Sequence, residues 1–501
     1  MPPPPAPDIP PDINATSRLA RRHKPNPPPP APSYTPFRVA EKHFKRRDRP
    51  VDLSGVIDMR RLEEWVGRGM LEEVVLGSAS VGREDLPKGP SNPSSDPAPA
   101  PDLRLSSPHF GWLDASAGAS PGPPPRAFTV PGFPGMVLIQ SPFHPRGERE
   151  VVKKCVREYT RAPNVTNLDT HWDIRKTAHT VCFPGAGLWD LREKEARGEL
   201  PPDFTIPLRK VEPAGSGQDA GRGSGSGSGD GGSDSQPQAG TDEAHSSGPV
   251  SVDDTSDTPS GPGVVEAYLL LPNPPSTPAN YLRPLPPSAL LDSRIRWTSI
   301  GLYYDWTTKE YVGLSTSGSA GGGTGGGARI LDGAPPVPVE ISDISRAVVG
   351  FPGIREIVMG GKDAEMYEPQ GGIVNYYGLK DTLMAHQDRS EADGESPLVS
   401  ISFGSTGIFL VGGATKDSPP IAIFLRSGDI VVLSGPTRRS FHGLPRVLPS
   451  TLPSYFFRDP ADAPDRDGEW DLIADFMTNE AEQVRNGGVG RRINVNVRQV
   501  C

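Results

Sequence analysis

The strongest constraint on the fold is a change in sequence periodicity at about residue 370. From there the chain runs as short β-rich segments, punctuated by Gly, Asp or Pro at intervals of roughly 8 to 12 residues. The segments are IVNYY, LVSISFG, GIFLVGG, IAIFLRSGDIVVLSG, SFHGLPRVL, SYFFR and INVNVR. This punctuation is typical of antiparallel strands rather than of βαβ units. The pattern predicts a mainly β, α+β domain with flanking helices, built as a double-sheet jelly roll, also called a double-stranded β-helix.

Three segments upstream of this region have a periodicity of their own. Residues 56–75 and 148–163, VIDMRRLEEWVGRGMLEEVV and EREVVKKCVREYTRAP, carry apolar residues at helical spacing and predict one helix each. We expect both helices to serve packing rather than chemistry. Residues 295–306, IRWTSIGLYYDW, predict strand instead, and we expect them to add a hairpin to the same sheet.

Composition separates the parts able to form a core from those that are not. The 501 residues include 61 Pro and 57 Gly, and only 35% are hydrophobic, which is too few to pack the whole chain. Pro-rich, Pro/Ser-rich and Gly/Ser-rich stretches predict long disordered segments. The expected organisation is disordered residues 1–33, a basic extension with a short helix at 34–85, disordered residues 86–126, the first part of the folded domain at 127–212, a disordered acidic insertion at 213–263, and the jelly-roll core at 264–501.

The formal net charge of −9 is unevenly distributed along the chain. Residues 215–263 hold eight acids and one base, a net of −7, so the rest of the protein carries only −2. Residues 1–50 hold ten Lys and Arg against four acids. The acidic total therefore does not exclude a polyanionic partner, and the basic arm suits either phosphate contacts or a solvated, targeting role.

Neither membrane insertion nor secretion is indicated. No stretch approaches the roughly 20 consecutive apolar residues of a membrane span, and the N-terminal MPPPPAPDIPPD lacks the basic-then-apolar pattern of a secretory signal. Cys155, Cys182 and Cys501 are scattered without CxxC spacing, which disfavours a disulfide framework or a zinc site. We therefore expect a soluble, monomeric intracellular protein without a membrane partner, located in the nucleus or cytoplasm, with the mitochondrion left open.

A candidate metal site lies in NYYGLKDTLMAHQDRSE, where His386 stands two residues before Asp388. Residues two apart in an extended chain point to the same face, so one imidazole and one carboxylate can bind a single ion. His442, in SGPTRRSFHGLPRV, follows 54 residues after Asp388 and is available as a third ligand. Two His and one carboxylate leave positions open for a chelating co-substrate and O2, which suits Fe(II). An HxD alone is more often ordinary strand sequence, and a zinc hydrolase could use the same three residues.

The C-terminal RRINVNVR alternates polar and apolar residues. Arg492, Asn494, Asn496 and Arg498 share one face of the expected strand, and Ile493, Val495 and Val497 share the other. Two permanent cations on one face suit a dicarboxylate, and they have no role in zinc hydrolysis. A basic exposed strand would explain the alternation, but not why the polar face should point into a small barrel.

Several of these elements together resemble the AlkB dioxygenases in order and spacing. They are NxY, the eleven-position spacing from Asn375 to His386 of HxD, PLVSISFG, GDIVVLSGPTRRSFHG and RxNxNxR. The resemblance covers roughly residues 131–212 and 264–501. PFRVAEKHFKRRDRPVDLSGVIDM, RAPNVTNLDTHW and RWTSIGLYYDWTTKEY also resemble the eukaryotic first-homologue branch of that family. The resemblance implies a dioxygenase that uses Fe(II), 2-oxoglutarate and O2.

Carried over residue by residue, the resemblance assigns two sets of contacts. The implied iron ligands are His386, Asp388 and His442. The implied 2-oxoglutarate contacts are Arg492 at the distal carboxylate, helped by Tyr377 and Asn494, and Asn375 and Arg498 near the end chelated to iron. Asn496 stands where relatives often have Thr, which should leave binding intact because that position mainly fills space. Ser390, followed by Glu391, stands where some relatives have an acid two residues after the iron-binding Asp, which leaves base preference open.

The implied reaction couples oxidative decarboxylation of 2-oxoglutarate, giving succinate and CO2, to hydroxylation of an N-methyl group on a base of tRNA, other RNA or DNA, with release of formaldehyde. A base in a duplex or folded RNA must first be extruded into a stacking pocket. The candidate substrate residues are Trp297, Tyr304 and Trp306 as pocket walls, Arg438 for a phosphate or cofactor contact, and Ser390 and Glu391. Aromatic residues alternating along a strand are more often core, and Arg438 and Arg439 also suit a surface salt bridge.

Two other functions stay open at this point. One is the same chemistry on a protein side chain, such as that of a histone tail, and the other is a catalytically silent nucleic-acid-binding jelly roll. A basic groove with exposed aromatics over residues 131–212 and 295–312 would favour nucleic acid over protein. The presence of all three candidate ligands and both arginines disfavours the silent module.

Overall fold

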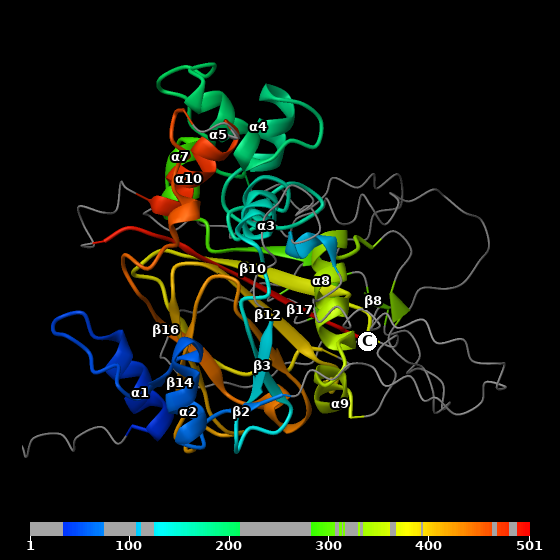
Figure 1. The fold of residues 1–501 in the computed structure, drawn as a ribbon. Coiled ribbons are helices and arrows are strands. Elements are labelled where there is room, and N and C mark those ends of the chain that lie inside the picture. The colour runs from blue at the N-terminus through cyan, green and yellow to red at the C-terminus, as the bar shows by residue number, and fades with distance from the viewer. Residues whose placement is uncertain are drawn as a thin grey trace, which may run out of the picture.

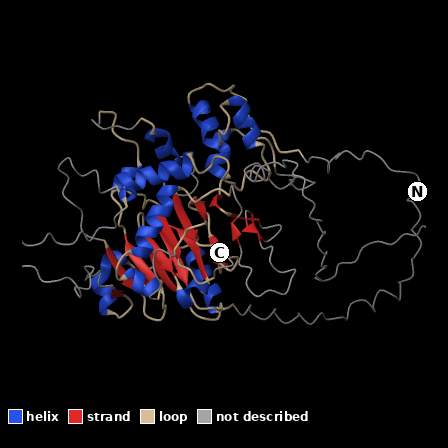
Figure 2. Ribbon diagram, turned by 90° about the vertical axis from the view of Figure 1, so that its right-hand side faces the viewer, coloured by secondary structure: helices blue, strands red, loops and turns tan. Residues whose placement is uncertain are grey.

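The computed structural model describes residues 34–74, 107–111, 125–210, 282–305, 310–312, 314–315, 329–330, 334–360, 367–391, 394–462, 468–479 and 488–501. Two β-sheets share a core, and helices cover the outer face of the larger sheet (Figure 1). The view turned by 90° shows the helices lying around the strands (Figure 2). The mainly β jelly roll with flanking helices that the strand periodicity predicts is thereby confirmed.

The larger sheet has eight strands in the order β2-β3-β4-β15-β12-β17-β10-β5. In that order they are Glu72–Glu73, Arg126–Thr129, Met136–Gln140, Ile430–Leu433, Leu398–Gly404, Arg492–Arg498, Gly371–Tyr377 and Trp297–Gly301. The C-terminal strand β17 lies between β10 and β12 and pairs antiparallel with both along its whole length. The RINVNVR segment is thus held from both sides near the middle of the sheet.

The smaller sheet has five strands in the order β1-β14-β13-β16-β11. They are Val56–Ile57, Ile421–Leu425, Gly407–Val411, His442–Val447 and Leu383–His386. Two small hairpins stand apart from both sheets, namely β6 Tyr303–Asp305 with β7 Glu310–Val312, and β8 Leu314–Ser315 with β9 Arg329–Ile330. β11 comes last in the strand order of the smaller sheet, so this strand, which ends at His386, forms one edge of that sheet.

The alternation of side chains along each strand decides what faces the interior. Ile493 and Val495 of β17 pack into the core that the larger sheet shares with its covering helices. Leu138 and Val431 point the other way and pack against Ile423 of the smaller sheet. Because successive side chains point to opposite faces, the polar residues of β17 face the space between the two sheets, as the sequence pattern predicts.

Helices enclose this β-structure on several sides (Figure 1). The helices that contribute to the core behind the larger sheet are α3 Pro145–Arg157, α4 Ile174–Val181, α5 Leu188–Ala196, α7 Pro287–Ser293, α8 Val339–Gly350, α9 Ile354–Val358 and α10 Trp470–Thr478. Two N-terminal helices, α1 Pro36–Lys45 and α2 Leu62–Gly67, lie on the side of the smaller sheet. Short 3-10 turns are η2 Met59–Arg61, η3 Pro108–Phe110, η6 Gly435–Arg439 and η7 Ser454–Phe456.

One of the two predicted helices is confirmed and the other is wrong. The confirmed helix is α3, which buries Val151, Val152 and Cys155. Residues 56–75 do not form one helix, because Val56–Ile57 pairs with β14 in the smaller sheet. Asp58 then accepts a hydrogen bond from the Arg60 amide and starts a 3-10 turn. The N-terminal extension is therefore part of the barrel rather than an appendage to it.

Three further expectations differ from the structure. Phe110 lies in a segment expected to be disordered, yet it is fully buried, with its ring centroid 4.7 Å from that of Phe143. The SYFFR segment forms the 3-10 turn η7 instead of a strand. Residues 295–306 divide at Gly301, which has a φ of 71°, so β5 joins the large sheet and β6 turns away into a separate hairpin. A side chain at Gly301 would meet the carbonyl oxygen of Gln370 at 2.5 Å.

Residues 1–33 and 213–263, both expected to be disordered, lie outside the described residues, as do 86–106 and 112–124. In the part of the chain that the structure describes, no helix combines the length and apolar character needed to cross a bilayer. Cys155, Cys182 and Cys501 form no disulfide.

Candidate metal centre and co-substrate cavity

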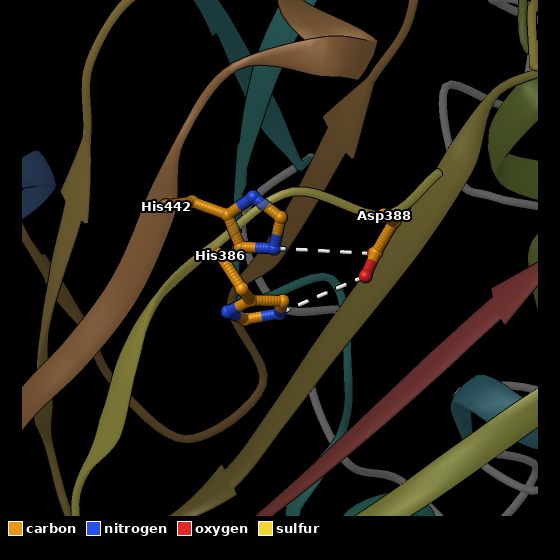
Figure 3. A group of neighbouring side chains, drawn as sticks. All are labelled: His386, Asp388 and His442. Carbon is orange, nitrogen blue, oxygen red and sulfur yellow. Dashed lines mark ion pairs between the residues drawn. The ribbon is translucent and has the colours of Figure 1, made fainter. Parts of the chain in front are cut away.

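The structure brings His386, Asp388 and His442 together in the barrel (Figure 3). The Nε2 atom of His386 lies 3.6 Å from one carboxylate oxygen of Asp388, and Nε2 of His442 lies 3.9 Å from the other. One donor atom from each residue lies within 4.8 Å of the other two. β11 and β16 are paired in the smaller sheet with His386 opposite His442, so the sheet register itself aligns the two imidazoles.

Backbone carbonyls fix the orientation of both imidazole rings. His386 Nδ1 lies 2.9 Å from the carbonyl oxygen of Met384, and His442 Nδ1 lies 3.1 Å from that of Ser440. A carbonyl oxygen only accepts, so each Nδ1 carries the proton and each Nε2 presents its lone pair towards Asp388. A histidine that donates from one ring nitrogen and ligates through the other is the usual arrangement at a protein metal site.

The electrostatics keep Asp388 and His442 in the protonation states that a metal needs. Burial by itself raises the pKa of Asp388, but Arg498 and the two histidines outweigh that effect and lower the pKa to about 2. Burial lowers the pKa of His442 to about 4, although Asp388 opposes the shift. At neutral pH the site therefore offers a carboxylate and a neutral imidazole from these two residues, both ready to donate an electron pair.

A narrow cavity between the two sheets extends from this cluster towards Arg492. His442, Tyr377, Asn494 and Arg492 are among the residues that line it. The Arg492 guanidinium donates to the carbonyl oxygen of Leu425 at 2.9 Å and to the hydroxyl of Ser402 at 2.6 Å. A dicarboxylate bound in this cavity would lie between Arg492 and the group of side chains formed by His386, Asp388 and His442.

Arg492 is a buried cation with unused capacity for an anion. Its side chain is 1% exposed, its Nε has no hydrogen-bond partner, and no carboxylate of the described residues forms an ion pair with it. Burial lowers the pKa of Arg492 to about 10, so the guanidinium stays charged at neutral pH. An unpaired buried charge is unfavourable without a counter-ion, which a ligand carboxylate would supply. Gly407 leaves room here, because a Cβ at that position would lie 2.9 Å from Arg492 Nε.

Arg498, at the other end of β17, lies beside the metal cluster. Its Nη1 is 4.0 Å from a carboxylate oxygen of Asp388. The same guanidinium forms an ion pair with Glu391 and donates to the hydroxyl of Tyr311 at 3.1 Å. Tyr311 in turn donates to Glu391 at 3.0 Å. Arg498 is thus fixed between Asp388, a candidate metal ligand, and Glu391, a buried acid that is only three residues further along the chain.

Two residues predicted to contact substrate belong to this buried network instead. The side chains of Glu391 and Arg438 are each 1% exposed, and the two form an ion pair at 3.3 Å. Arg438 also donates to the backbone carbonyls of Asp388 at 3.2 Å and Ser396 at 3.3 Å. Arg438 therefore makes no surface salt bridge, and both side chains are committed to a buried ion pair. Contacts of Arg438 with phosphate or cofactor, and of Glu391 with a base, stay predictions.

The other residues predicted to contact substrate do not lie together in one group. Trp297 begins β5 opposite Asn375 of β10 and is partly buried. Tyr304 packs edge-on against Tyr311, with ring centroids 5.4 Å apart, in a small apolar cluster. Ser390 is exposed, and Trp306 lies outside the described residues. Of the expected 2-oxoglutarate contacts, Tyr377, Arg492 and Asn494 line the cavity, whereas Asn375 and Arg498 do not.

The sequence reasoning missed residues that hold the predicted ones in place. Tyr311, Ser402 and Ser405 contact the two arginines of β17. Ser400 accepts a hydrogen bond from the Asn494 side chain at 2.9 Å. The alternation in LVSISFG could have indicated two of these residues, because Ser400 and Ser402 fall on one face of β12.

Comparison with known proteins agrees with this geometry. Residues 329–498 match the sequence model of the 2OG-Fe(II) oxygenase superfamily. The chain is 26% identical over 394 residues to the nucleic acid dioxygenase ALKBH1 of Mus musculus, which covers 75% of this chain and 66% of that protein. It is 31% identical over 219 residues to the tRNA demethylase abh1 of Schizosaccharomyces pombe, covering 44% of this chain and 57% of the relative. A DNA N(6)-methyladenine demethylase of Arabidopsis thaliana, ALKBH1A, is 35% identical over 164 residues, 32% of this chain and 39% of its own.

The fold, the His-Asp-His cluster and these matches define a 2-oxoglutarate-dependent dioxygenase. Residues 329–498 carry a 2OG-Fe(II) oxygenase domain, and the chain is similar to the ALKBH1 proteins over most of its length. Enzymes of this class use Fe(II), 2-oxoglutarate and O2. The residues present fit the metal, because two imidazole nitrogens and one carboxylate are the donor set typical of Fe(II) oxygenases.

Proposed function

We propose that this dioxygenase oxidatively demethylates N-methylated bases of nucleic acid, in tRNA, other RNA or DNA, and releases formaldehyde, succinate and CO2. The observation that carries the proposal is the continuity of one cavity from His442 of the metal cluster to the unpaired guanidinium of Arg492. The named activities of the mouse, fission yeast and Arabidopsis relatives, which all act on nucleic acid, support the choice of substrate.

The proposed iron ligands are His386, Asp388 and His442. Bound there, Fe(II) would supply the activation of O2 that no side chain can perform. The protein's own task is to hold the ligands in one geometry. The Met384 and Ser440 carbonyls keep both Nε2 atoms free for the metal, and Arg498 keeps the nearby Asp388 ionised.

The proposed role of Arg492 is to pair with the distal carboxylate of 2-oxoglutarate, with Tyr377 and Asn494 lining the same cavity. Asn375 and Arg498 are proposed to lie near the end that is chelated to the metal. Burial of these groups excludes water and strengthens each charge-assisted hydrogen bond. Positioning of the methyl group close to the metal should then account for much of the rate.

The partner proposed for the exposed side of the metal site is a single extruded nucleotide. His386 has a 37% exposed side chain, so the metal cluster is accessible from outside the barrel. Ser390 is exposed in the loop after Asp388, and Trp297 and Tyr304 are retained as candidate pocket walls. We further propose a monomer that acts in the nucleus or cytoplasm, where such substrates occur.

The test is incubation of purified protein with Fe(II), ascorbate and 2-oxoglutarate, together with total tRNA or genomic DNA. Mass spectrometry of the nucleosides should detect loss of a methylated base in step with formaldehyde release. The Asp388→Ala variant is the control for contaminating activity. Hydroxylation of a histone peptide, with no change in any nucleoside, would overturn the proposed substrate class in favour of a protein.

A further inference from the structure

Helix α1 lies behind the two strands that carry the metal-binding histidines. It packs against both β11 and β16, and Figure 1 shows it on the side of the molecule where the smaller sheet lies. Its N-terminal cap is Thr35, whose hydroxyl accepts from the Arg38 amide. Phe37 and Phe44 are buried against the smaller sheet, in contact with Ile408 and Leu410. The helix is therefore a fixed part of the fold, although at least 340 residues separate it from the histidines.

Each histidine follows directly after a residue that α1 contacts. Ala385, which precedes His386, donates its amide hydrogen to the Glu41 carboxylate at 2.7 Å. Phe441, which precedes His442, packs edge-on against Phe37, with ring centroids 6.5 Å apart. Both contacts come from one face of one helix. Since β11 is the edge strand of its sheet, only β16 pairs with it in the sheet, and α1 supplies a second support.

Glu41 is well held for such a role. It is 4% exposed, and its second carboxylate oxygen accepts from Arg38 at 3.0 Å. The buried acid thus has a charged partner on one oxygen and the Ala385 amide on the other. Arg38 and Lys45 also lie 3.7 Å and 3.6 Å from the sulfur of Met384, whose carbonyl orients the His386 ring. The contacts of α1 therefore extend over the two residues that set the position of His386.

We propose that Glu41 is a positioning residue for the metal site: by anchoring the backbone at Ala385, it holds His386 where it can ligate together with Asp388 and His442. This inference rests on the proposed ligand set and adds a determinant from the N-terminal segment. The basic residues of that segment suggested phosphate contacts, whereas Glu41, one of its four acids, serves the metal site. Loss of an outer partner of a metal ligand typically weakens metal binding by about 10- to 100-fold.

Metal affinity is the direct test, with Co(II) as the probe under anaerobic conditions and its visible absorption as the signal. We expect Glu41→Ala to bind Co(II) about 10-fold or more weakly than the wild type. Glu41→Gln keeps an oxygen that can accept from Ala385, so its affinity should stay within about threefold of the wild type. Arg38→Met removes the ion pair and keeps the acceptor, and it should also bind nearly normally. Equal affinities of Glu41→Ala and the wild type would overturn the proposal.

Two controls separate a specific effect from general destabilisation. Glu73→Ala removes another N-terminal acid, whose ion pair with Arg126 is half exposed, and it should leave Co(II) affinity unchanged. In the metal-free protein, hydrogen exchange should accelerate in the peptide around Ala385 of Glu41→Ala, while β12 and β17 exchange as in the wild type. Uniform acceleration across the barrel would mean that Glu41 serves stability alone.

The same titration distinguishes this inference from the proposed function. Co(II) binding involves no nucleic acid, so failure to find a demethylated base leaves the result for Glu41 intact. Co(II) binding that His442→Ala does not weaken would instead overturn the ligand set on which both rest.

Discussion

Glu391 is the shared counter-ion of Arg498 and Arg438, and it meets them at a point where both arginine side chains are buried. The Glu391 side chain is 1% exposed, and those of the two arginines are 8% and 1% exposed. Arg498 lies next to the carboxylate of Asp388, and Arg438 donates to its backbone carbonyl. One acid therefore connects both arginines that contact the proposed metal ligand.

Replacing Glu391 should be costly for that reason. Glu391→Ala leaves two buried guanidinium groups without their counter-ion, and breaking a buried ion pair typically costs about 3 to 5 kcal/mol. Chemical denaturation should show a loss of that size in the free energy of unfolding. Glu73→Ala, which removes a half-exposed acid from its pair with Arg126, should cost about 1 kcal/mol or less. Comparable losses in the two variants would contradict the central place of Glu391.

The three proposed iron ligands should be individually indispensable. His386→Ala, Asp388→Ala and His442→Ala each leave two protein ligands, too few to hold iron in a site with several exchangeable positions. We expect both demethylation and uncoupled succinate production to vanish. Stoichiometric metal analysis before each assay guards against adventitious iron. Full 2-oxoglutarate decarboxylation in any of the three variants would show that the ligand set is wrong.

Stability should depend on pH through Glu148, a helix α3 acid that accepts a hydrogen bond from Ser427. Burial is the main cause that raises the pKa of Glu148 from 4.5 to about 8. The folded state therefore holds this proton more tightly than the unfolded chain does. Its contribution to stability is fully present below about pH 4.5 and is lost as the pH rises through about 8, at up to about 1.4 kcal/mol per pH unit.

Glu148→Gln should remove this dependence, because an amide does not ionise. Denaturation at pH 6 and pH 8.5 should show a smaller decline for the variant than for the wild type. Glu150→Gln is the matched control, since it changes an exposed acid on the same helix and should follow the wild type at both pH values. Parallel pH curves for Glu148→Gln and the wild type would contradict the raised pKa.

Short-range periodicity accounts for the parts of the site that the sequence predicts well. The two-residue repeat of RINVNVR puts Arg492 and Asn494 on one face, and the structure turns that face towards the cavity. His386 ends β11, and Asp388 follows two residues later in the loop, where the two side chains also meet. Such predictions succeed because a strand fixes the direction of each side chain locally, whatever the rest of the chain does.

The errors come from contacts that no local pattern encodes. Glu391 follows closely after HxD, yet its partner Tyr311 lies 80 residues away on a separate hairpin. Ala385 is joined to Glu41 across 344 residues. Residues 56–75 show helical spacing, but pairing of Val56 and Ile57 with β14 overrides it. Local propensity is weak compared with the burial that tertiary contacts provide.

Arg492 is a buried cation without an acidic partner among the described residues, so its removal should weaken the binding of 2-oxoglutarate. Arg492→Ala removes the charge proposed to bind the distal carboxylate of 2-oxoglutarate. Truncating one partner of a buried charge pair typically costs about 2 to 5 kcal/mol, which corresponds to about 30-fold to several-thousand-fold in affinity. Arg492→Lys should recover only part of the loss, because a point charge cannot replace a planar fork of donors.

Affinity for 2-oxoglutarate should be measured without oxygen at saturating Fe(II), so that binding is separated from turnover. Iron binding should survive in Arg492→Ala, since this residue lies on β17 of the larger sheet and both histidines lie on strands of the smaller sheet. Arg126→Ala, which removes an exposed arginine from β3, the neighbour of an edge strand of the large sheet, is the control and should bind 2-oxoglutarate normally. If Arg492→Ala and the wild type bound 2-oxoglutarate equally, the cavity between the sheets would not be the co-substrate site, and the cation buried there would need a different anion.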